Sequence, residues 1–325
     1  MKASITTGYG PPEVLQVKEI QTPVPKENEI LIKIYASSVT AGDCELRRFK
    51  IPLLFWLPIR FYMGLFKPRK KILGQEFSGV VESTGKSVTK FKKGDKVFGS
   101  TEMHLSAHAE YISIPETYPV GMIPDIMNFE EASGVPVGAF NALVFLKRAN
   151  IKPGQKILIY GSTGSIGTFA VQIAKYFGAE VTAVCREESF KLMESLGVDK
   201  MIDYTKGPYW KSGEKYDIVF EVVGKTPYGW GIKALKEKGI YLLANPKMGA
   251  KFRGFLTSIM TKIKVSSKTV DYTTEDLILI KKMIEEKKVK PVIDRTFPLE
   301  KIQDAHRYVE LGTKVGNVII TINQN

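Results

Sequence analysis

The chain has 325 residues, of which 44% are hydrophobic and 25% are charged. These proportions exclude an intrinsically disordered chain and are typical of a globular protein long enough for two domains. The only cysteines, Cys44 and Cys185, lie far apart in the sequence, which excludes a disulfide framework and a four-cysteine zinc cluster and favours a cytoplasmic location.

The N-terminus carries no apolar signal segment, and no run reaches the roughly 18 apolar residues of a membrane span, so we expect neither. The net charge of +13 is concentrated in two windows without acids. Residues 46–75 contain eight bases and residues 238–270 contain seven. Such windows attract anions. Because no nucleic-acid-binding module accompanies them, we expect no nucleic-acid partner.

The first 124 residues alternate apolar and polar positions in short runs broken by glycine and proline, which predicts a mostly β domain. Its expected strands lie near residues 30–36, 77–82, 96–99 and 109–114. Within this part, residues 51–59 form an apolar, proline-broken segment flanked by bases. We expect this segment to cover another part of the protein.

After residue 124 the pattern changes to strands that alternate with helices. Helices are expected from Phe129 and Pro136, and strands at residues 156–160, 180–185, 216–224 and 239–244. This alternation predicts a parallel, doubly wound α/β sheet. A capped helix near residues 274–280 and a final strand at residues 316–322 complete the chain.

The central feature of the sequence is the turn at residues 161–167, between an expected strand and an expected helix. Gly164 and Gly167 stand where the second and third glycines of G-x-G-x-x-G belong, and Ser162 replaces the first. In this motif, glycines let the backbone approach a pyrophosphate at the positive end of the helix. The turn therefore predicts dinucleotide binding.

Several further motifs accompany the turn. They are residues 41–43 (AGD), 73–81 (LGQEFSGVV), 91–99 (FKKGDKVFG), 109–111 (AEY), 195–199 (SLGVD) and 203–204 (DY). With them the sequence resembles the medium-chain dehydrogenase/reductase superfamily, in its zinc-free quinone oxidoreductase (zeta-crystallin-like) branch. The resemblance implies a GroES-like catalytic domain at residues 1–124 and 268–325, a Rossmann domain at residues 125–267, an active site in the cleft between them, and a homodimer.

The zinc-dependent branches of this superfamily hold their catalytic metal with cysteine and histidine ligands. Here Thr40 and Gln75 stand at two of those positions, so the usual ligands of a catalytic zinc are missing and we expect no metal. His104, His108 and His306 remain, and we assign them solvated or structural roles because no cysteine or carboxylate shares their spacing.

Arg186 follows the second Rossmann strand, where an acidic residue usually accepts the free ribose 2′-OH of NAD. An arginine can pair with a 2′-phosphate, and Tyr204 matches a tyrosine of the related branch, so we expect NADPH. Glu187 and Glu188 leave NADH open as an alternative, and Arg186 could instead pair with one of them. The predicted cofactor-binding residues are Ser162, Thr163, Gly164, Ser165, Ile166, Gly167, Cys185, Arg186, Tyr204, Val223, Gly224, Ala244 and Asn317.

Without a Lewis acid, the expected reaction is hydride transfer to an acceptor that is itself electrophilic, namely a small apolar quinone or enone. The resemblance places Thr40 and Asn141 at positions beside the nicotinamide, so the predicted catalytic residues are Thr40 as a hydrogen-bond donor and Asn141 as a contact of the nicotinamide, with Tyr62 as a proton source. Each also has a structural interpretation: a turn residue, a helix-surface residue and a core residue. The alternative function is a non-catalytic NADPH-binding protein with a regulatory or peripheral membrane role.

The two basic windows have three competing interpretations: an apolar substrate funnel, a dimer edge around residues 263–266, or contact with an anionic membrane. The first two are favoured over the membrane, because Pro52 and Pro58 oppose a continuous interfacial helix.

Overall fold

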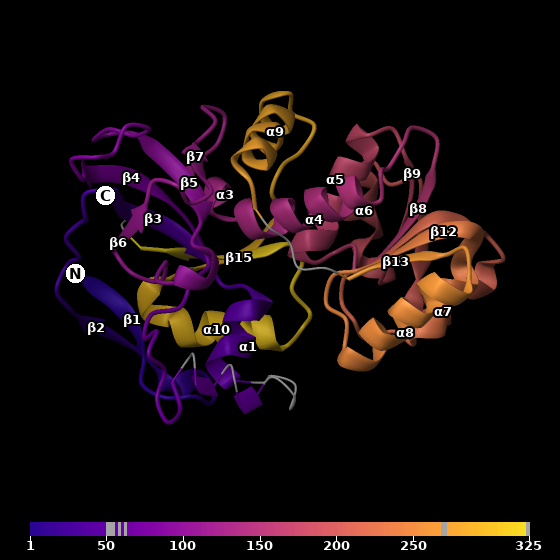
Figure 1. Cartoon of the computed structure of the whole chain (residues 1–325), viewed down its shortest axis with the longest axis horizontal. Helices are drawn as coiled ribbons and strands as arrows, with labels where there is room; N and C mark the ends of the chain where they lie inside the picture. The colour runs from indigo at the N-terminus through magenta and orange to yellow at the C-terminus, as the bar shows by residue number, and fades with distance from the viewer. Residues whose placement is uncertain (50–55, 58–59, 62–63, 268–271, 323–325) are drawn as a thin grey trace. The chain divides into compact units, whose positions relative to one another are not determined.

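The computed structural model describes residues 1–49, 56–57, 60–61, 64–267 and 272–322. The chain divides into two compact units (Figure 1). The first comprises residues 1–137, 273–281 and 291–325, and the second comprises residues 138–272 and 282–290. The chain passes from the first unit to the second within α4 (Pro136–Arg148), and α9 (Thr274–Glu285) is shared between them. The predicted domain boundaries at residues 124 and 268 stay a prediction.

The first unit is built on a mostly antiparallel sheet in the order β14-β15-β3-β4-β5-β7, with β6 also paired to β3. Alternate residues of β3, Ile30, Ile32 and Ile34, are fully buried in one apolar cluster of this unit, since alternate side chains of a strand point to the same face. Separately, β1 (Lys2–Thr6) and β2 (Leu15–Glu19) form a two-stranded ladder. The strands of the larger sheet are β3 (Glu29–Ser38), β4 (Glu76–Thr84), β5 (Lys96–Ser100), β6 (Tyr111–Pro115), β7 (Val120–Met122), β14 (Ile293–Pro298) and β15 (Asn317–Thr321).

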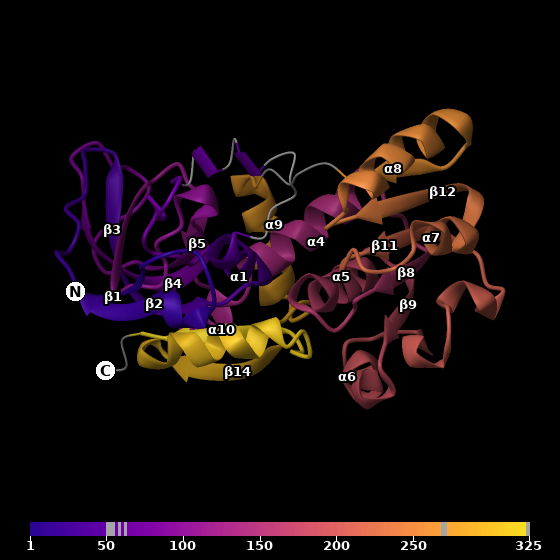
Figure 2. The ribbon, with the colours of Figure 1, turned by 90° about the horizontal axis from the view of Figure 1, so that it is seen from below.

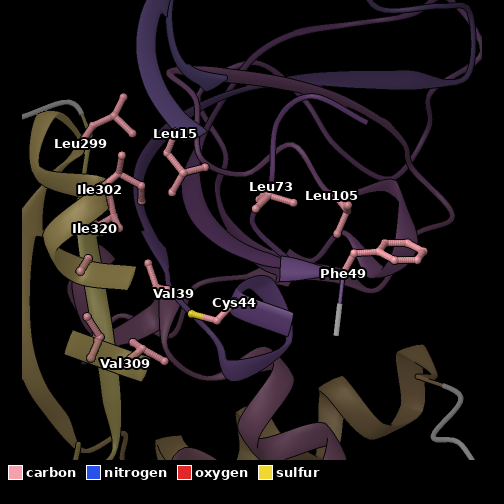
Figure 3. Packing of buried hydrophobic residues seen from close by; sticks show 12 residues of the cluster. Leu15, Val39, Cys44, Phe49, Leu73, Leu105, Leu299, Ile302, Val309 and Ile320 are labelled. Carbon is pink, nitrogen blue, oxygen red and sulfur yellow. The ribbon is translucent and has the colours of Figure 1, made fainter. Parts of the chain in front are cut away.

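A second apolar cluster of this unit joins segments from both ends of the chain (Figure 3). Leu15 from β2 and Cys44 from α1 (Ala41–Arg48) belong to one cluster with Ile302 and Val309 from α10 (Ile302–Glu310). Helix α3 (Phe129–Ser133) also belongs to this unit. Contacts between such distant segments explain why the C-terminal strands complete the N-terminal sheet.

The second unit contains a six-stranded sheet in the order β10-β9-β8-β11-β12-β13, in which every neighbouring pair is parallel. Numbered from its first strand, this is the order 3-2-1-4-5-6 of the Rossmann fold. The predicted fold class, a GroES-like domain with a Rossmann domain, is confirmed. The strands are β8 (Lys156–Tyr160), β9 (Glu180–Cys185), β10 (Lys200–Asp203), β11 (Tyr216–Glu221), β12 (Leu235–Leu243) and β13 (Lys264–Ser266).

Helices lie on both faces of this sheet. From β8 to β9 and β10 the chain moves across the sheet in one direction, and from β11 to β12 and β13 it moves in the opposite direction. Because crossover connections are right-handed, the helices of the two halves lie on opposite faces of the sheet. Figures 1 and 2 show the two groups. The helices are α5 (Ser165–Tyr176) and α6 (Phe190–Ser195) in the first group, and α7 (Tyr228–Ala234) and α8 (Met248–Met260) in the second.

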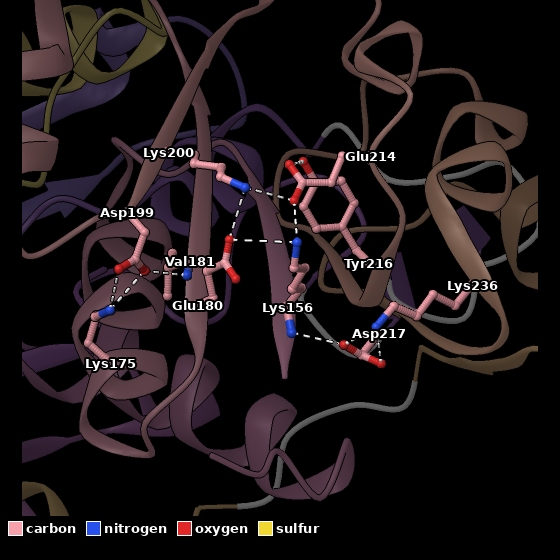
Figure 4. Close-up of polar contacts among 10 residues, drawn as sticks. All are labelled: Lys156, Lys175, Glu180, Val181, Asp199, Lys200, Glu214, Tyr216, Asp217 and Lys236. Atoms are coloured by element: carbon pink, nitrogen blue, oxygen red, sulfur yellow. Dashed lines mark hydrogen bonds and ion pairs between the residues drawn. The ribbon is translucent and has the colours of Figure 1, made fainter. Parts of the chain in front are cut away.

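Ion pairs join the amino-terminal ends of the parallel strands (Figure 4). The carboxylate of Glu214 lies 2.6 Å from the ammonium group of Lys156 and 2.8 Å from that of Lys200. Lys200 also lies 3.0 Å from Glu180. Nearby, Asp217 accepts from the backbone N–H of Lys156 at 2.9 Å. These contacts fix the sheet edge opposite the one where a Rossmann fold binds nucleotides.

We expect Glu214→Gln to lower the free energy of unfolding near pH 7 by about 0.5–1 kcal/mol. Hydrogen bonds from Lys156 and Lys200 lower the pKa of Glu214 from 4.5 to about 2. A carboxylate with a depressed folded-state pKa stabilises the fold above its unfolded pKa, and this contribution is lost as the pH falls toward the folded pKa. The difference between variant and wild type in urea unfolding should therefore shrink below about pH 4.5. Glu194→Gln, an exposed position on α6, serves as the control. An equal difference at every pH would contradict the role of the ion pairs.

Candidate functional site

The strand order of the second unit reverses between β8 and β11, and ligands of such sheets bind outside the carboxyl ends of the strands at this point. The glycine turn at residues 161–167 follows β8 there and leads into α5. The loop at residues 222–227 follows β11 at the same edge. The predicted residues Ser162 to Gly167, Val223 and Gly224 thus gather at one edge of one sheet.

The three glycines of the turn meet different steric conditions. Gly161 has a φ of +81°, and a Cβ on Gly167 would lie 2.1 Å from the carbonyl oxygen of Gly161. These two positions therefore exclude a side chain because of the protein's own backbone. A Cβ on Gly164 would meet only the Gly161 carbonyl oxygen, at 3.7 Å. The space above Gly164 is open, so the chain's own packing would accept a side chain there, and a ligand can approach this backbone closely.

Gly164 is also the N-cap of α5 and makes no side-chain cap. The first N–H groups of a helix have no acceptor within it, and the helix dipole adds positive potential at this end. An open backbone surface with free donors at a helix N-terminus is the environment that a pyrophosphate requires. The turn therefore fits a dinucleotide.

Two of the predicted cofactor residues turn their side chains inward. Ser162 is fully buried, and its hydroxyl donates to the carbonyl oxygen of Val184 at 3.3 Å, which ties the turn to β9. Cys185 is buried too, and burial raises the pKa of its thiol to about 11, so it stays neutral. Cofactor contacts at these two positions stay a prediction, and only their backbone is placed to make them.

Arg186 and Tyr204 meet beyond the ends of β9 and β10. The Nε of Arg186 donates to the Tyr204 hydroxyl at 2.7 Å, and this bond raises the pKa of the guanidinium. Glu187 pairs instead with Lys206 at 2.7 Å. Arg186 therefore forms a hydrogen bond with Tyr204, which is also a predicted cofactor residue, and not an ion pair with the adjacent Glu187. The pair forms a cationic corner with a phenol at the end of the second Rossmann strand.

The loop after β11 depends on Glu221, which the sequence analysis missed. Its carboxylate is buried and accepts from the backbone N–H groups of Val223, at 3.0 Å, and Gly224, at 2.9 Å, and from the Thr226 hydroxyl. Burial raises the pKa of Glu221, while these bonds favour its ionised form. Glu221 thereby fixes the two loop residues predicted to contact cofactor. Ala244, another predicted residue, donates its N–H to the Glu221 carbonyl oxygen at 3.0 Å.

In the first unit, Thr40 caps α1. Its hydroxyl donates to Asp43 Oδ2 at 2.6 Å and accepts from the Asp43 N–H at 3.1 Å, which completes a capping box. Asp43 Oδ1 accepts from the N–H of Gly74 at 3.0 Å, and Gln75 Oε1 lies 3.4 Å from the Thr40 hydroxyl. In this structure the hydroxyl proton of Thr40 is donated to Asp43, so the side chain has a structural role as a helix cap. Its role as donor to substrate stays a prediction.

Of the remaining predicted residues, two form hydrogen bonds within their own units and one lies outside the described residues. Asn141 donates from Nδ2 to the Tyr272 hydroxyl at 3.0 Å, within the second unit. Asn317, in the first unit, is buried and donates to the carbonyl oxygen of Val292 at 3.1 Å. Tyr62 lies outside the described residues. The sequence analysis also missed Tyr272, whose ring stacks on Phe140 at 4.6 Å.

Two of the three histidines are buried in the first unit. His108 Nε2 lies 2.9 Å from the carbonyl oxygen of Ser38, and His306 Nδ1 lies 3.3 Å from the sulfur of Cys44. Burial lowers the pKa of His306 and raises that of Cys44 to about 12, so both are neutral. Among the residues that the structure describes, no cluster of three or more histidine, cysteine or carboxylate side chains could hold a metal.

Comparisons with known proteins agree with this geometry. A model of the alcohol dehydrogenase GroES-like domain matches residues 26–156, and a model described as zinc-binding dehydrogenase matches residues 196–320. The chain is 31% identical to the 2-methylene-furan-3-one reductase of Solanum lycopersicum, across 98% of this chain and 79% of that protein. The chain belongs to the medium-chain dehydrogenase/reductase superfamily.

Two further relatives place this medium-chain reductase in the quinone oxidoreductase-like branch. It is 28% identical to the chloroplastic NADPH-dependent alkenal/one oxidoreductase of Arabidopsis thaliana, across 98% of this chain and 79% of that protein. It also superimposes on the structure of the quinone oxidoreductase from Coxiella burnetii with a TM-score of 0.90, at 26% identity and 99% coverage of both chains. The predicted family is confirmed, and the chain is an oxidoreductase that uses a nicotinamide cofactor.

The unequal space at the two glycines gives a paired test. We expect Gly164→Ala to weaken NADPH binding on the order of tenfold while leaving the midpoint of thermal unfolding unchanged, because its methyl group enters open space where the nucleotide binds. Gly167→Ala should instead lower the unfolding midpoint, because its methyl group meets backbone atoms. Isothermal titration and thermal unfolding measure the two effects. Unchanged NADPH affinity in Gly164→Ala would show that the nucleotide lies elsewhere.

Proposed function

We propose that this medium-chain reductase uses NADPH to reduce quinones and α,β-unsaturated carbonyl compounds without a catalytic zinc ion. The observation that carries the proposal is the open surface over Gly164 at the N-terminus of α5, on the nucleotide-binding edge of a Rossmann sheet. The named activities of its relatives, on an alkenal or enone and on quinones, supply the class of acceptor. Homodimerisation, which the family resemblance implies, is part of the same proposal.

The preference for NADPH rests on the corner formed by Arg186 and Tyr204. A guanidinium pairs with phosphate through charge-assisted hydrogen bonds, which are stronger than bonds between neutral groups. The corner follows β9, where a Rossmann fold meets the adenosine ribose. Only NADPH carries a phosphate on that ribose, so an arginine at this position favours NADPH over NADH.

The acceptor class follows from the residues at the positions where zinc-dependent relatives keep their ligands. Thr40 and Gln75 bring a hydroxyl and an amide, which are poor ligands for zinc compared with thiolate and imidazole. Bound NADPH would supply the hydride. Quinones and enones accept hydride without Lewis-acid activation, and the protein then has to position them and stabilise the developing negative charge.

The direct test of this function is NADPH oxidation by purified protein with a panel of quinones and enones, in the presence of a metal chelator. We expect turnover with at least one member of each class and no loss of rate on chelation. Tight NADPH binding without oxidation by any acceptor would instead support the non-catalytic alternative. Loss of turnover on chelation, with recovery on addition of zinc, would contradict the zinc-independent chemistry.

Replacing the arginine tests the cofactor preference separately. We expect Arg186→Gln to raise the dissociation constant for NADPH roughly 10- to 100-fold and to change that for NADH little, because only NADPH loses charge-assisted hydrogen bonds to its 2′-phosphate. Fluorescence titration with both nucleotides measures the change. Lys191→Gln, which removes one positive charge from an exposed position on α6, is the matched control. Equal weakening of both nucleotides would contradict a 2′-phosphate contact.

A further inference from the structure

Helix α8 packs on the second unit through its small side chains. A Cβ on Gly254 would lie 2.8 Å from Val265 of β13, so the helix backbone approaches this strand closely. One turn further, the Thr257 hydroxyl lies 2.8 Å from the hydroxyl of Tyr228 on α7. Ala250 lies on the same face and packs against the apolar cluster of this unit. The inward face of α8 is thus made of alanine, glycine and threonine.

The large apolar side chains of α8 point the other way. Their exposed fractions range from 37% to 78%, although side chains of this kind usually lie in a core. At 100° per residue, five of the six fall on one stripe, opposite the face that packs on the unit. These large exposed side chains are Met248, Phe252, Phe255, Leu256, Ile259 and Met260.

Bases border this apolar stripe on both sides. By helical angle, Lys251 lies along one edge and Arg253 along the other, and both are exposed. Lys247 precedes the helix, and Lys262 and Lys264 follow it. Residues 238–267 contain no acid, and the nearby Glu237 is already paired with Lys262 at 2.6 Å. The surface is therefore apolar along its middle and cationic along its borders.

We propose that α8 docks on the surface of an anionic lipid bilayer, with its apolar stripe among the acyl chains near the headgroups and its bases on the lipid phosphates. This combination of an apolar stripe and basic borders is characteristic of helices that lie in the membrane interface. Among the helices in the described part of the chain, none is long and apolar enough to cross a bilayer. The contact is peripheral, and it holds whether or not the proposed reductase activity is correct.

A second copy of this chain fits the same surface less well. A two-fold interface brings the same patch of both subunits together, so it would place the bases that border α8 opposite one another. Like charges facing across an interface cost free energy, whereas anionic headgroups complement them. The prolines that weighed against an interfacial helix belong to residues 51–59, and α8 contains none. The exposed stripe thus favours a membrane contact for α8, whereas the dimer edge around residues 263–266 includes β13 and stays a prediction.

Co-sedimentation with vesicles tests the proposal on the full-length protein. The probes are phosphatidylcholine vesicles with and without roughly one-third phosphatidylglycerol, at low and high salt. We expect binding to the anionic vesicles at low salt, weaker binding at high salt because the charges are screened, and little binding to phosphatidylcholine alone. Protein that stays in the supernatant with anionic vesicles at low salt would overturn the proposal.

Two double variants separate the apolar and the charged contributions. Phe252→Ser with Phe255→Ser should lower the vesicle partition coefficient at least about tenfold. Lys251→Gln with Arg253→Gln should lower it roughly 30-fold. The control is Ile278→Ser, which removes a 62% exposed apolar side chain on α9 and should bind as wild type does. Circular dichroism and the midpoint of thermal unfolding verify that each variant is folded.

Sedimentation velocity of the same variants without lipid tests whether a second copy of the chain covers the apolar stripe of α8. We expect the phenylalanine variant to keep the sedimentation coefficient of the wild type. A lower coefficient, together with unchanged vesicle binding, would assign the stripe to a second copy and overturn the membrane proposal. Wild-type vesicle binding in both double variants would overturn it as well.

Discussion

The candidate site depends on one close backbone approach, at Gly167. No side chain fits there, because the carbonyl of Gly161 and the backbone of Ser162 occupy the space that a Cβ would take. This contact sets the N-terminus of α5 directly against the end of β8, and the positive φ of Gly161 makes the tight turn between them. Only with α5 held this close does Gly164 present an open backbone surface at the positive end of the helix. The other parts of the nucleotide site are arranged around that point.

The parallel sheet brings those parts to the same edge by different means. Arg186 follows β9 and is held by the Tyr204 hydroxyl, and Glu221 ends β11 and binds the N–H groups of the loop behind it. At the opposite edge, the ion pairs around Glu214 join the starts of the strands. The sheet is therefore fixed at one edge by lysine and glutamate pairs and shaped at the other by glycines, an arginine and a buried carboxylate. At the nucleotide-binding edge, Glu187 pairs with Lys206, and Arg186 is held by the Tyr204 hydroxyl instead.

Local sequence patterns predicted a mostly β domain, a parallel α/β sheet and the position of the glycine turn because each depends on neighbouring residues, whereas the GroES-like assignment came from the family resemblance. The spacing of Gly164 and Gly167 and the alternation of strands with helices belong to this class. The capping box of Thr40 and Asp43 also has a sequence signature, and recognising it would have identified Thr40 as a cap. Glu221 is different, since nothing beside it shows that it is buried or that Val223 and Gly224 donate to it. The sequence analysis did not predict α8, and the spacing of its residues alone could not have shown that the small face packs inward.

The central claim is that the open glycine turn and the corner of Arg186 and Tyr204 form one binding site for NADPH. Displacement of protein-bound NADPH by adenosine 2′,5′-bisphosphate and by adenosine 5′-monophosphate, followed by nucleotide fluorescence, tests it most directly. We predict that the bisphosphate displaces NADPH at a concentration roughly tenfold lower or better, because only it carries the phosphate that Arg186 can bind. Equal potency of the two competitors would contradict the claim.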